Sequence, residues 1–370
     1  MSSSPLRVAV IGLGNAAQSL HLPALKGIPA ATIVGGVDPD AERRARAASR
    51  WGLTTYADVD ELMRAASPEV VIVCTPPETH VAVGTAALRQ GAHLICEKPI
   101  AASVDDADRL LDAARAAGRR VAMNHEFREM PAFRAVRDAI AADGSGLVFA
   151  QAWQLMNLPP WAEPGWRGQL MKGVLYEAGI HLVDYLMALF GERPQAVNAT
   201  MSTCGVRDDD TDAVAIVTLE FASGALAQIL QHRLCPGETQ YFEVRADTRV
   251  ASYRVSYGGR ARVSAGLLRS TSPHVRVELG ASGLAWRETG AKRSIIGRNP
   301  KDAPMVATRL LLQRTLDGLR TGGDVPASGE DGRDAVRVVA ASYVSAREGR
   351  RVIIDEHDAV ARLSMAAASF

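Results

Sequence analysis

The sequence predicts an α/β protein of two domains, with an N-terminal doubly wound parallel sheet and a C-terminal α/β domain built on an open, mostly antiparallel sheet. Three observations lead to this prediction. The chain has 370 residues, which is more than one hydrophobic core usually holds. Short apolar runs alternate with alanine-rich helical stretches in its first third, which is typical of a parallel sheet covered on both faces. Strand-like runs later follow one another without helices between them, which is typical of antiparallel pairing.

The first third supplies five β-branched, apolar runs that we interpret as the parallel strands. They lie at Arg7–Ile11, Thr32–Val37, Val70–Cys74, His93–Cys96 and Val121–Met123. We expect the first domain to span residues 1–124 and the second to span residues 125–370, with the C-terminal segment free to pack back on the first domain.

The second half has a different pattern, in which one or two helices precede a run of strands. We expect helices at Ala132–Ala142, Leu175–Phe190, Val306–Arg320 and Asp331–Arg347, and strands at Val148–Gln154, Ala213–Phe221, Ala225–His232, Tyr241–Arg245 and Val352–Ile354. A segment rich in proline, tryptophan and glycine, Pro159–Gly173, reads as a loop.

The composition limits the classes of function. A formal net charge of +1, with 22% charged and 47% hydrophobic residues, is that of an ordinary globular protein, so we expect no nucleic-acid and no membrane partner. No apolar stretch has the length of a signal peptide's core or of a membrane span, and we therefore expect a cytoplasmic protein. The four cysteines are dispersed and lack Cys-x-x-Cys spacing, so we expect neither a disulfide framework nor a metal site.

A glycine-rich segment directly follows the first strand and opens a helix running toward Lys26, which is the context that a dinucleotide fingerprint requires. Gly12 permits the tight turn, Gly14 lets the backbone approach a pyrophosphate, and Ala17 replaces the third glycine where helix and strand meet. The helix N-terminus would then face the phosphates. The loop residues expected to bind the coenzyme are Gly12, Leu13, Gly14, Asn15 and Ala16.

Asp38 ends the second strand about 20 residues after the glycine loop, where a carboxylate binds the adenosine ribose hydroxyls. This favours NAD. The alternative is that Asp38 only caps the helix beginning near Pro39. Arg43 and Arg44 lie close behind and would suit a 2′-phosphate, so NADP stays open as the coenzyme.

The next two strands end in polar segments that should meet at the carboxyl edge of the sheet, where open α/β folds bind their ligands. One is Thr75-Pro76-Pro77-Glu78-Thr79-His80 and the other is Glu97-Lys98-Pro99. A lone ammonium there would polarise a substrate oxygen beside the nicotinamide. We expect Thr75, Pro76, His80, Glu97 and Lys98 to bind the coenzyme, although His80 heads a helix and has helix capping as its structural alternative.

The expected helix Leu175–Phe190 is apolar nearly all round except for Glu177, His181 and Asp184. These residues lie at i, i+4 and i+7, on one face. A polar stripe on a buried helix must be paired or must line a cavity. A catalytic site and a structural network are therefore both open.

Taken together, these motifs resemble the Gfo/Idh/MocA family of oxidoreductases. The matching segments are Gly12-x-Gly14-x-x-Ala17, Thr75-Pro76-Pro77-x-x-His80, Glu97-Lys98-Pro99, Asn124-x-x-x-Arg128, Trp166-Arg167, Gly179-x-His181-x-x-Asp184 and the C-terminal Ser328-Gly329-Glu330-Asp331-Gly332-Arg333. The resemblance covers nearly the whole chain and implies an N-terminal Rossmann domain, with an open C-terminal sheet that often forms a homo-oligomer interface, as a dimer or tetramer.

The resemblance also implies roles for individual residues. Lys98 would hydrogen-bond the reacting oxygen, His181 would move its proton, and Glu177 would contact His181 or substrate hydroxyls. The corresponding position is commonly aspartate in sugar dehydrogenases of the family, so Glu177 is one methylene longer. The Lys-Pro peptide is often cis. The implied substrate-binding residues are Asn124, Arg128, Trp166, Arg167 and Asp184.

The expected function is therefore NAD(P)-dependent hydride transfer to or from a secondary alcohol or ketone of a sugar, polyol or related small molecule. Two other functions fit the same motifs. One is an NAD-dependent enzyme that cleaves glycosides through transient oxidation, and the other is a non-catalytic sensor that binds a dinucleotide.

Overall fold

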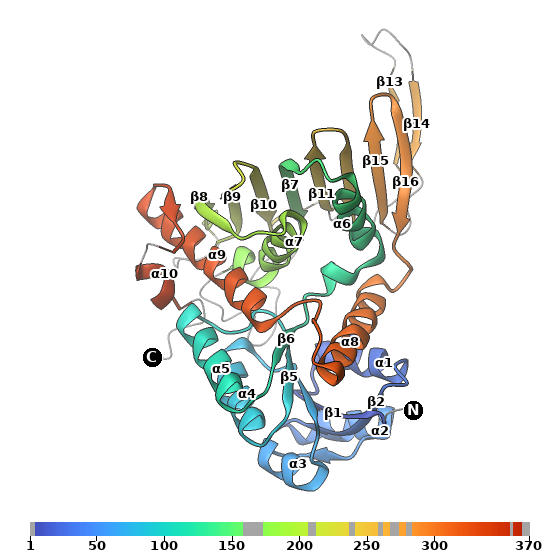
Figure 1. Ribbon diagram of the computed structural model, residues 1–370, viewed down its shortest axis with the longest axis vertical. Coiled ribbons are helices and arrows are strands. Elements are labelled where there is room, and N and C mark those ends of the chain that lie inside the picture. The colour runs from blue at the N-terminus through green and yellow to red at the C-terminus, as the bar shows by residue number, and fades with distance from the viewer. Residues whose placement is uncertain are drawn as a thin grey trace.

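Two sheets organise the chain, one above the other in Figure 1. The computed structural model describes residues 4–157, 173–205, 212–236, 241–257, 262–266, 274–278, 283–355 and 358–364. It confirms the predicted fold class, since a six-stranded parallel sheet precedes a nine-stranded, mostly antiparallel one.

The first sheet has the strand order β3-β2-β1-β4-β5-β6, and its neighbouring strands all pair in parallel. This is the order of a dinucleotide-binding Rossmann sheet. Its strands are β1 (Leu6–Ile11), β2 (Ala31–Val37), β3 (Thr55–Tyr56), β4 (Val70–Val73), β5 (His93–Cys96) and β6 (Val121–Met123). β4 is a run of valine and isoleucine that is buried throughout, as a central parallel strand requires.

Helices connect these strands, and short polar side chains begin several of them. The side chains of Asp40, Asp58 and Ser103 each accept a backbone N–H from the first turn that follows. The elements are η1 (Ala17–His21), α1 (Leu22–Lys26), α2 (Ala41–Trp51), α3 (Val59–Ala66), η2 (Pro77–Thr79), α4 (His80–Arg89) and α5 (Val104–Ala116).

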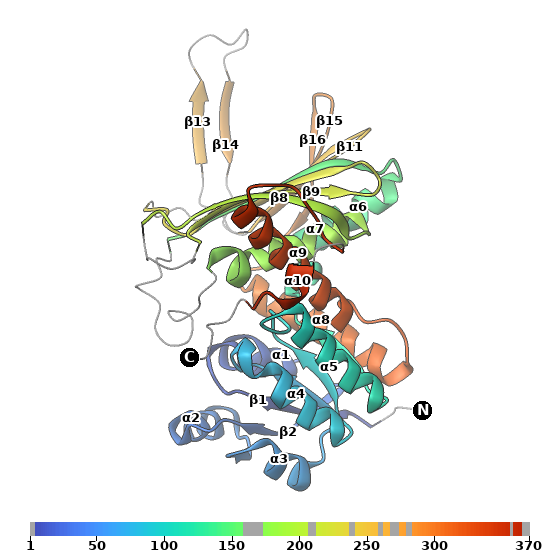
Figure 2. The ribbon, with the colours of Figure 1, turned by 90° about the vertical axis from the view of Figure 1, so that its left-hand side faces the viewer.

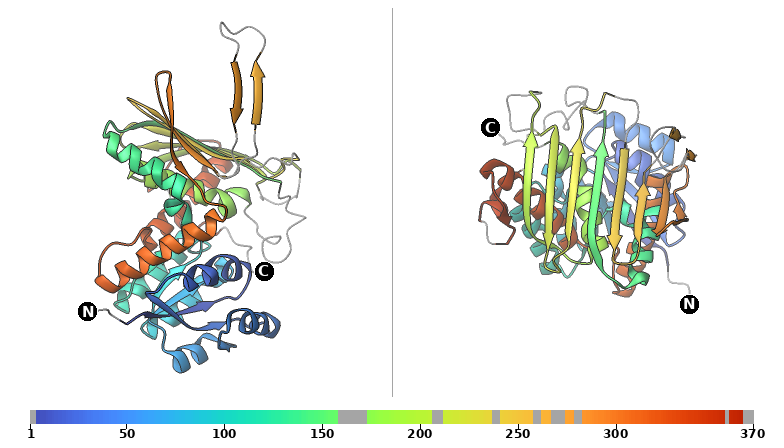
Figure 3. Two further views of the ribbon diagram at one scale, coloured as in Figure 1. Left: turned by 90° about the vertical axis from the view of Figure 1, so that its right-hand side faces the viewer. Right: turned by 90° about the horizontal axis from the view of Figure 1, so that it is seen from above.

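The second sheet has the order β16-β15-β12-β11-β7-β10-β9-β8-β17, in which only β7 and β10 pair in parallel among the described strands. Helices pack on one face, and the other face carries no helix in the view from above (Figure 3). A separate hairpin of β13 and β14 projects away from the sheet (Figure 2). The strands are β7 (Leu147–Leu155), β8 (Pro194–Ser202), β9 (Val214–Phe221), β10 (Leu226–His232), β11 (Tyr241–Thr248), β12 (Ser252–Ser256), β13 (Arg262–Gly266), β14 (His274–Glu278), β15 (Leu284–Thr289), β16 (Lys292–Arg298) and β17 (Val352–Ile353).

The helices of the second half include η3 (Glu126–Glu129), α6 (Pro131–Asp143), η6 (Leu175–Gly179), α7 (Ile180–Phe190), α8 (Ala303–Thr321), α9 (Gly329–Glu348) and α10 (Asp358–Arg362). The predicted helix Leu175–Phe190 is present, but its first turn, η6, is a π-helix that runs directly into α7. No helix in the described parts of the chain combines the length and the apolar composition that crossing a bilayer requires.

The end of the chain returns to the first sheet. α8 packs on η1 and α1, and α9 packs on α5 and β6 as well as on β8 of the second sheet. The backbone N–H of Met123 donates to the carbonyl of Ala327 (2.9 Å), and Ala122 forms a β-bridge with Ser328. Ser328 then begins α9 through a capping box with Asp331. The segment from α8 to α9 therefore contacts both sheets.

Candidate active site

A cleft of about 890 Å³ lies at the carboxyl edge of the parallel sheet, beside the loop that follows β1. This volume is in the usual range for small-molecule and cofactor sites. The cleft is lined by every residue that the sequence predicted for coenzyme binding except His80. Those residues are Gly12, Leu13, Gly14, Asn15, Ala16, Asp38, Thr75, Pro76, Glu97 and Lys98.

The glycine loop fits the pyrophosphate of a dinucleotide. Gly12 has φ +89°, and a Cβ on it would lie 2.8 Å from the backbone carbon and oxygen of Cys74. A Cβ on Gly14 would meet no atom within 4 Å, so its backbone borders open space. Ala17 is fully buried where the helix meets the sheet. The turn, the open backbone and the tight contact are the three features that the fingerprint requires.

Asp38 lies at the edge of the cleft where the ribose of a bound dinucleotide belongs. Its carboxylate accepts the backbone N–H groups of Leu13 and Asp40, both at 2.9 Å. The residue that caps α2 is Asp40, whose side chain accepts the N–H of Arg43 (3.0 Å). Capping of that helix therefore does not account for Asp38.

The arginines behind Asp38 differ in position. Arg43 and Arg46 line the same end of the cleft. The Arg44 guanidinium instead donates to the backbone carbonyls of Asp38 (2.8 Å) and Pro39 (2.9 Å). The Asp38 carboxylate would repel a 2′-phosphate beside it, whereas Arg43, 3.8 Å from that carboxylate, would attract one.

His80 is not among the residues that line the cleft, although the sequence assigned it to the coenzyme. It is buried, with Nε2 2.8 Å from the carbonyl oxygen of Thr75 and Nδ1 3.0 Å from that of Pro99. Burial lowers the pKa of His80. The buried imidazole thus links the segment after β4 to the segment after β5 without lining the cleft.

Glu97 is a buried carboxylate that lies among hydrogen-bond donors. It accepts from Asn124 Nδ2 (2.8 Å), from the backbone N–H of Lys98 (3.2 Å) and from His21 Nε2, 2.7 Å away. Burial alone would raise the pKa of Glu97, but the hydrogen bond and charge of His21, together with Lys98 and Asn124, lower it to about 2. The Asn124 amide, predicted to contact substrate, is therefore held by Glu97.

Lys98 reaches from the first sheet to the start of the helix η6–α7. The Lys98–Pro99 peptide is cis, and the ammonium donates to the backbone carbonyl of Glu177 (2.9 Å). Glu177 also lines the cleft, and its carboxylate is 3.7 Å from the buried guanidinium of Arg233. The cleft therefore ends where the two sheets' elements meet.

Asp212 holds the beginning of this helix. Its carboxylate accepts the backbone N–H groups of Gly173 (2.7 Å) and Leu175 (3.0 Å) and the hydroxyl of Tyr343 (2.6 Å). At the other end of the π-helical turn, a Cβ on Gly179 would lie 3.1 Å from the Gln231 amide nitrogen. The π-helical turn is thus fixed at its start by a carboxylate and at its end by close packing.

His181 lies one turn beyond Glu177, and its imidazole lies beside the carboxylate of Glu126, in η3. His181 Nδ1 and Glu126 Oε2 are 3.9 Å apart. The ring of Phe127 packs edge-on against the imidazole, with centroids 4.8 Å apart. Burial lowers the pKa of His181 well below its ordinary value, and the charges of Lys98 and His125 act in the same direction. His181 is therefore neutral at pH 7.

The third residue of the predicted polar stripe, Asp184, forms a buried ion pair with Arg128. Three hydrogen bonds of 2.6 to 3.1 Å join the guanidinium to the carboxylate, and the two side chains are 8% and 1% exposed. Arg128 also contacts Asp331 (3.2 Å) and donates to the carbonyl of Pro326 (3.0 Å). The two residues predicted to bind substrate are occupied by each other and by α9.

The stripe of Glu177, His181 and Asp184 therefore contacts three different partners. Glu177 pairs with Arg233, which directly follows β10. His181 and Asp184 lie beside two residues of η3, Glu126 and Arg128. A π-helical turn rotates Glu177 relative to the α-helical positions that follow, so the i, i+4 spacing does not describe one straight face.

Sequence reasoning missed Glu126, Arg233 and Tyr257. Tyr257 is 38% exposed, and its ring lies beside Phe127, with centroids 6.0 Å apart. No spacing or motif in the sequence marks these positions, because each joins the site from a separate element. Trp166 and Arg167, predicted to contact substrate, lie outside the described residues.

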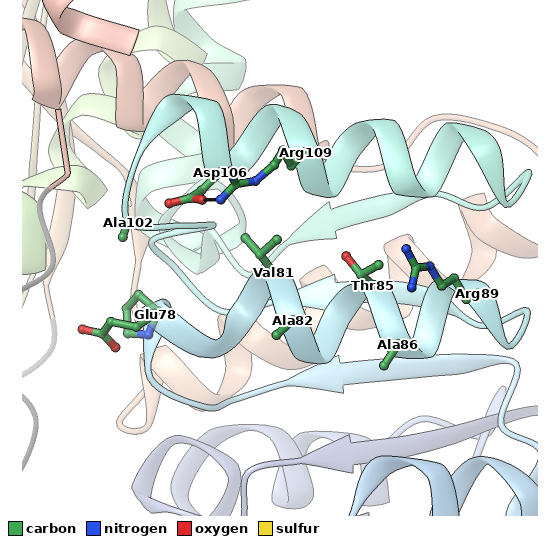
Figure 4. A pocket seen from close by; sticks show the side chains of 10 residues that line it. Glu78, Val81, Ala82, Thr85, Ala86, Arg89, Ala102, Asp106 and Arg109 are labelled. Atoms are coloured by element: carbon green, nitrogen blue, oxygen red, sulfur yellow. Dashed lines mark hydrogen bonds and ion pairs between the residues drawn. The ribbon is translucent and has the colours of Figure 1, made fainter. Parts of the chain in front are cut away.

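A second pocket, of about 460 Å³, lies between α4 and α5 (Figure 4). Small side chains such as Ala82 and Ala86 form much of its wall, and the charged groups Asp106 and Arg109 pair with each other. Its chemistry thus differs from that of the cleft. Within the described ranges, no three histidine, cysteine or acidic side chains are grouped to hold a metal ion.

Comparison with known proteins agrees with this fold. Residues 6–125 match the model described as "Oxidoreductase family, NAD-binding Rossmann fold", and residues 133–251 match the "GFO/IDH/MocA C-terminal domain". The fold and the site define an NAD(P)-dependent oxidoreductase. The chain belongs to the Gfo/Idh/MocA family, which confirms the resemblance inferred from its motifs.

Several relatives are named for a sugar or inositol substrate. The chain is 30% identical to 1,5-anhydro-D-fructose reductase of Ensifer adhaerens over 60% of its own length and 68% of that protein. It is 27% identical to inositol 2-dehydrogenase 4 of Saccharopolyspora erythraea over 95% and 96% of the two chains. Among solved structures, an oxidoreductase from Agrobacterium radiobacter in complex with NAD+, L-tartaric acid and magnesium has a TM-score of 0.77 at 20% identity, with 95% and 99% of the chains covered.

Proposed function

We propose that the protein transfers a hydride between NAD and a secondary alcohol or ketone carbon of a sugar, polyol or related small molecule, with NADP as the alternative coenzyme. The observation that carries this proposal is the Lys98 ammonium at the end of a cleft whose other end is lined by the glycine loop and Asp38. The relatives named for sugar and inositol substrates support the substrate class.

In this function, Lys98 exchanges its hydrogen bond with the Glu177 carbonyl for one to the reacting oxygen, and its positive charge stabilises the alkoxide that forms. Neutral His181 accepts the alcohol proton on its ring during oxidation and returns it during reduction. When bound, the nicotinamide supplies the acceptor or donor of the hydride.

We propose two roles for the surrounding polar residues. Glu177, which lines the cleft end, contacts substrate hydroxyls, and the buried Arg233, 3.7 Å from its carboxylate, orients it. Asn124 and the pair of Arg128 and Asp184 hold the loop after β6 and the helix of His181 in register, since their polar groups are engaged within the protein.

We further propose that a second copy of the chain covers the face of the nine-stranded sheet that carries no helix (Figure 3). Large apolar side chains are exposed on this sheet, among them Val148, Ile216 and Leu226. A face of this kind is typical of a protein interface. Sedimentation of the purified protein tests the proposal, and a monomer at micromolar concentration contradicts it.

A coupled screen tests the function. Sugars and polyols, including myo-inositol and 1,5-anhydro-D-fructose, are incubated with NAD or NADP, and the absorbance of the reduced nicotinamide is followed. With a substrate in hand, Lys98→Met and His181→Ala should each lower kcat by about 10²- to 10⁴-fold, because each removes a group that acts on the reacting oxygen. Coenzyme affinity, measured by calorimetry, should be retained.

The exposed Glu78→Gln variant is the matched control, and it should keep the activity of the unmodified protein. Turnover close to that of the unmodified protein in either Lys98→Met or His181→Ala would contradict the assigned roles. Absence of any nicotinamide reduction or oxidation across the screen would contradict the substrate class.

A further inference from the structure

Two buried polar atoms that lack a hydrogen-bond partner lie close to each other, one on His181 and one on Glu126. The atoms are His181 Nδ1 and Glu126 Oε2, 3.9 Å apart, in residues that are each 8% exposed. A buried polar atom without a partner is costly. A shift of about 1 Å would bring this pair to hydrogen-bond distance and satisfy both atoms at once.

The enclosure of Nδ1 assigns a direction to the imidazole. The nitrogen that faces Glu126 is shut off from solvent, whereas Nε2 is not among the enclosed, unpartnered atoms. Because Nδ1 faces Glu126, Nε2 is the ring nitrogen that remains to meet a ligand. In a neutral imidazole one nitrogen carries the proton and the other accepts one, so the partner of Nδ1 decides what Nε2 can do.

We propose that Glu126 and His181 form a proton relay, in which the proton on Glu126 sets the tautomer of His181 and thereby the direction in which His181 can serve the reacting oxygen. The inference rests on the proposed function. With Glu126 ionised, Nδ1–H donates to Oε2, and Nε2 is free to accept the proton of an alcohol. With Glu126 protonated, the carboxyl donates to Nδ1, and Nε2–H can protonate the oxygen of a ketone.

The relay conserves protons in each direction, since every bond to hydrogen that breaks is matched by one that forms. During oxidation the alcohol O–H breaks as Nε2–H forms, and Nδ1–H breaks as the Oε2–H bond of Glu126 forms. The carbon is oxidised by the hydride loss that the proposed function already contains. During reduction both protons move the opposite way. The imidazole stays neutral overall, which agrees with its burial beside the ammonium of Lys98.

The surroundings of Glu126 let it hold a proton near neutral pH. Burial raises the pKa of Glu126 to about 8, the charge of Glu97 acts in the same direction, and the ammonium of Lys98 opposes it. Asp184, in α7, also raises the pKa, and the Tyr257 hydroxyl lies near enough for Glu126 to affect the pKa of that tyrosine. His125 precedes Glu126 in the chain and adds to the low pKa of His181. Glu126 is a positioning residue, because it acts through His181.

The tautomer of His181 can be measured without any substrate. Full-length protein labelled with ¹⁵N-histidine and saturated with NAD is titrated from pH 6 to pH 10, and NMR records which ring nitrogen carries the proton. His181→Ala assigns the signal. We expect the proton of His181 to move from Nε2 to Nδ1 with a midpoint near pH 8.

Two variants at carboxylates beside this helix form a matched pair. In Glu126→Gln the pH-dependent change of tautomer should disappear, because an amide does not titrate. In Glu177→Gln the change should persist. Should Glu126→Gln not fold, Glu126→Asp keeps the carboxyl but withdraws it by one methylene, and the midpoint should then shift.

A His181 tautomer that is constant from pH 6 to pH 10 in the unmodified protein overturns the proposal. It is also overturned by a change of tautomer that survives unaltered in Glu126→Gln or Glu126→Asp, or that is lost in Glu177→Gln. A negative result in the sugar and polyol screen would contradict the proposed function. The NMR titration uses no substrate, so its outcome would still test the relay.

Discussion

Replacing Glu126 by glutamine should stabilise the protein at neutral and alkaline pH, and the gain should disappear in acid. Burial raises the pKa of this carboxyl from an ordinary 4.5 to about 8 in the folded chain. Below pH 4.5 the group is protonated in the folded and the unfolded chain alike. As the pH rises from 4.5 to 8, the unfolded chain ionises while the folded chain does not, so the free energy of unfolding falls.

The magnitude follows from the two pKa values. Each pH unit between them lowers the free energy of unfolding by about 1.36 kcal/mol. The loss reaches about 3 kcal/mol at pH 7 and about 5 kcal/mol above pH 8. Glutamine has the same shape without the charge, so Glu126→Gln should raise the free energy of unfolding by about these amounts, and by less than about 1 kcal/mol at pH 5.

Urea unfolding at pH 5, 7 and 9 measures the effect as a change in the midpoint at constant slope. Glu78→Gln, at an exposed position, controls for the loss of one negative charge. Equal stability of Glu126→Gln and the unmodified protein at pH 9 would show that the carboxyl ionises as readily inside the protein as outside, and the reasoning about its environment would fail.

Three further predictions concern other parts of the site. Glu97→Gln should lower the free energy of unfolding by about 3 kcal/mol at pH 7, because the pKa of Glu97 in the folded chain is lowered to about 2. This loss should vanish as the pH falls from 4.5 toward 2, and a loss in urea unfolding that is independent of pH would contradict the prediction. Gly12→Ala should weaken NAD binding by at least about tenfold, since its Cβ would meet the backbone of Cys74 at 2.8 Å, and unchanged affinity by calorimetry would refute the clash. Asp184→Ala should cost about 3 to 5 kcal/mol in urea unfolding by leaving the Arg128 guanidinium buried without its main partner, and a loss below about 1 kcal/mol would argue against that.

The parallel sheet and its cleft could be predicted from the sequence because their signals are local. The turn at Gly12, the carboxylate of Asp38 and the strand end before Lys98 follow from the strand-and-helix pattern alone, and this topology brings successive strand ends to one edge. The two-residue strand Thr55–Tyr56 was missed, because it is too short to show an alternating pattern.

The partners of the polar side chains could not be predicted in the same way. Glu126 and His181 are 55 positions apart, and no spacing relates a turn after β6 to a helix beneath another sheet. The π-helical turn at Leu175–Gly179 also changes the face that Glu177 presents, and its first residue is held by Asp212, which lies just before β9 and far away in the sequence. Tertiary packing decides these pairings.

The return of the chain through α8 and α9 has a consequence for exchanging parts between relatives. We propose that a chimera which replaces only the first 124 residues would fail to assemble, because Met123 and Ala122 bond to the segment Ala327–Ser328 and α8 packs on α1. A working hybrid would need to take residues 303–348 from the same parent. The coenzyme-binding half of this enzyme thus depends on two separate stretches of sequence, residues 1–124 and residues 303–348. A library that shuffles Gfo/Idh/MocA sequences should therefore place crossovers on both sides of residues 303–348.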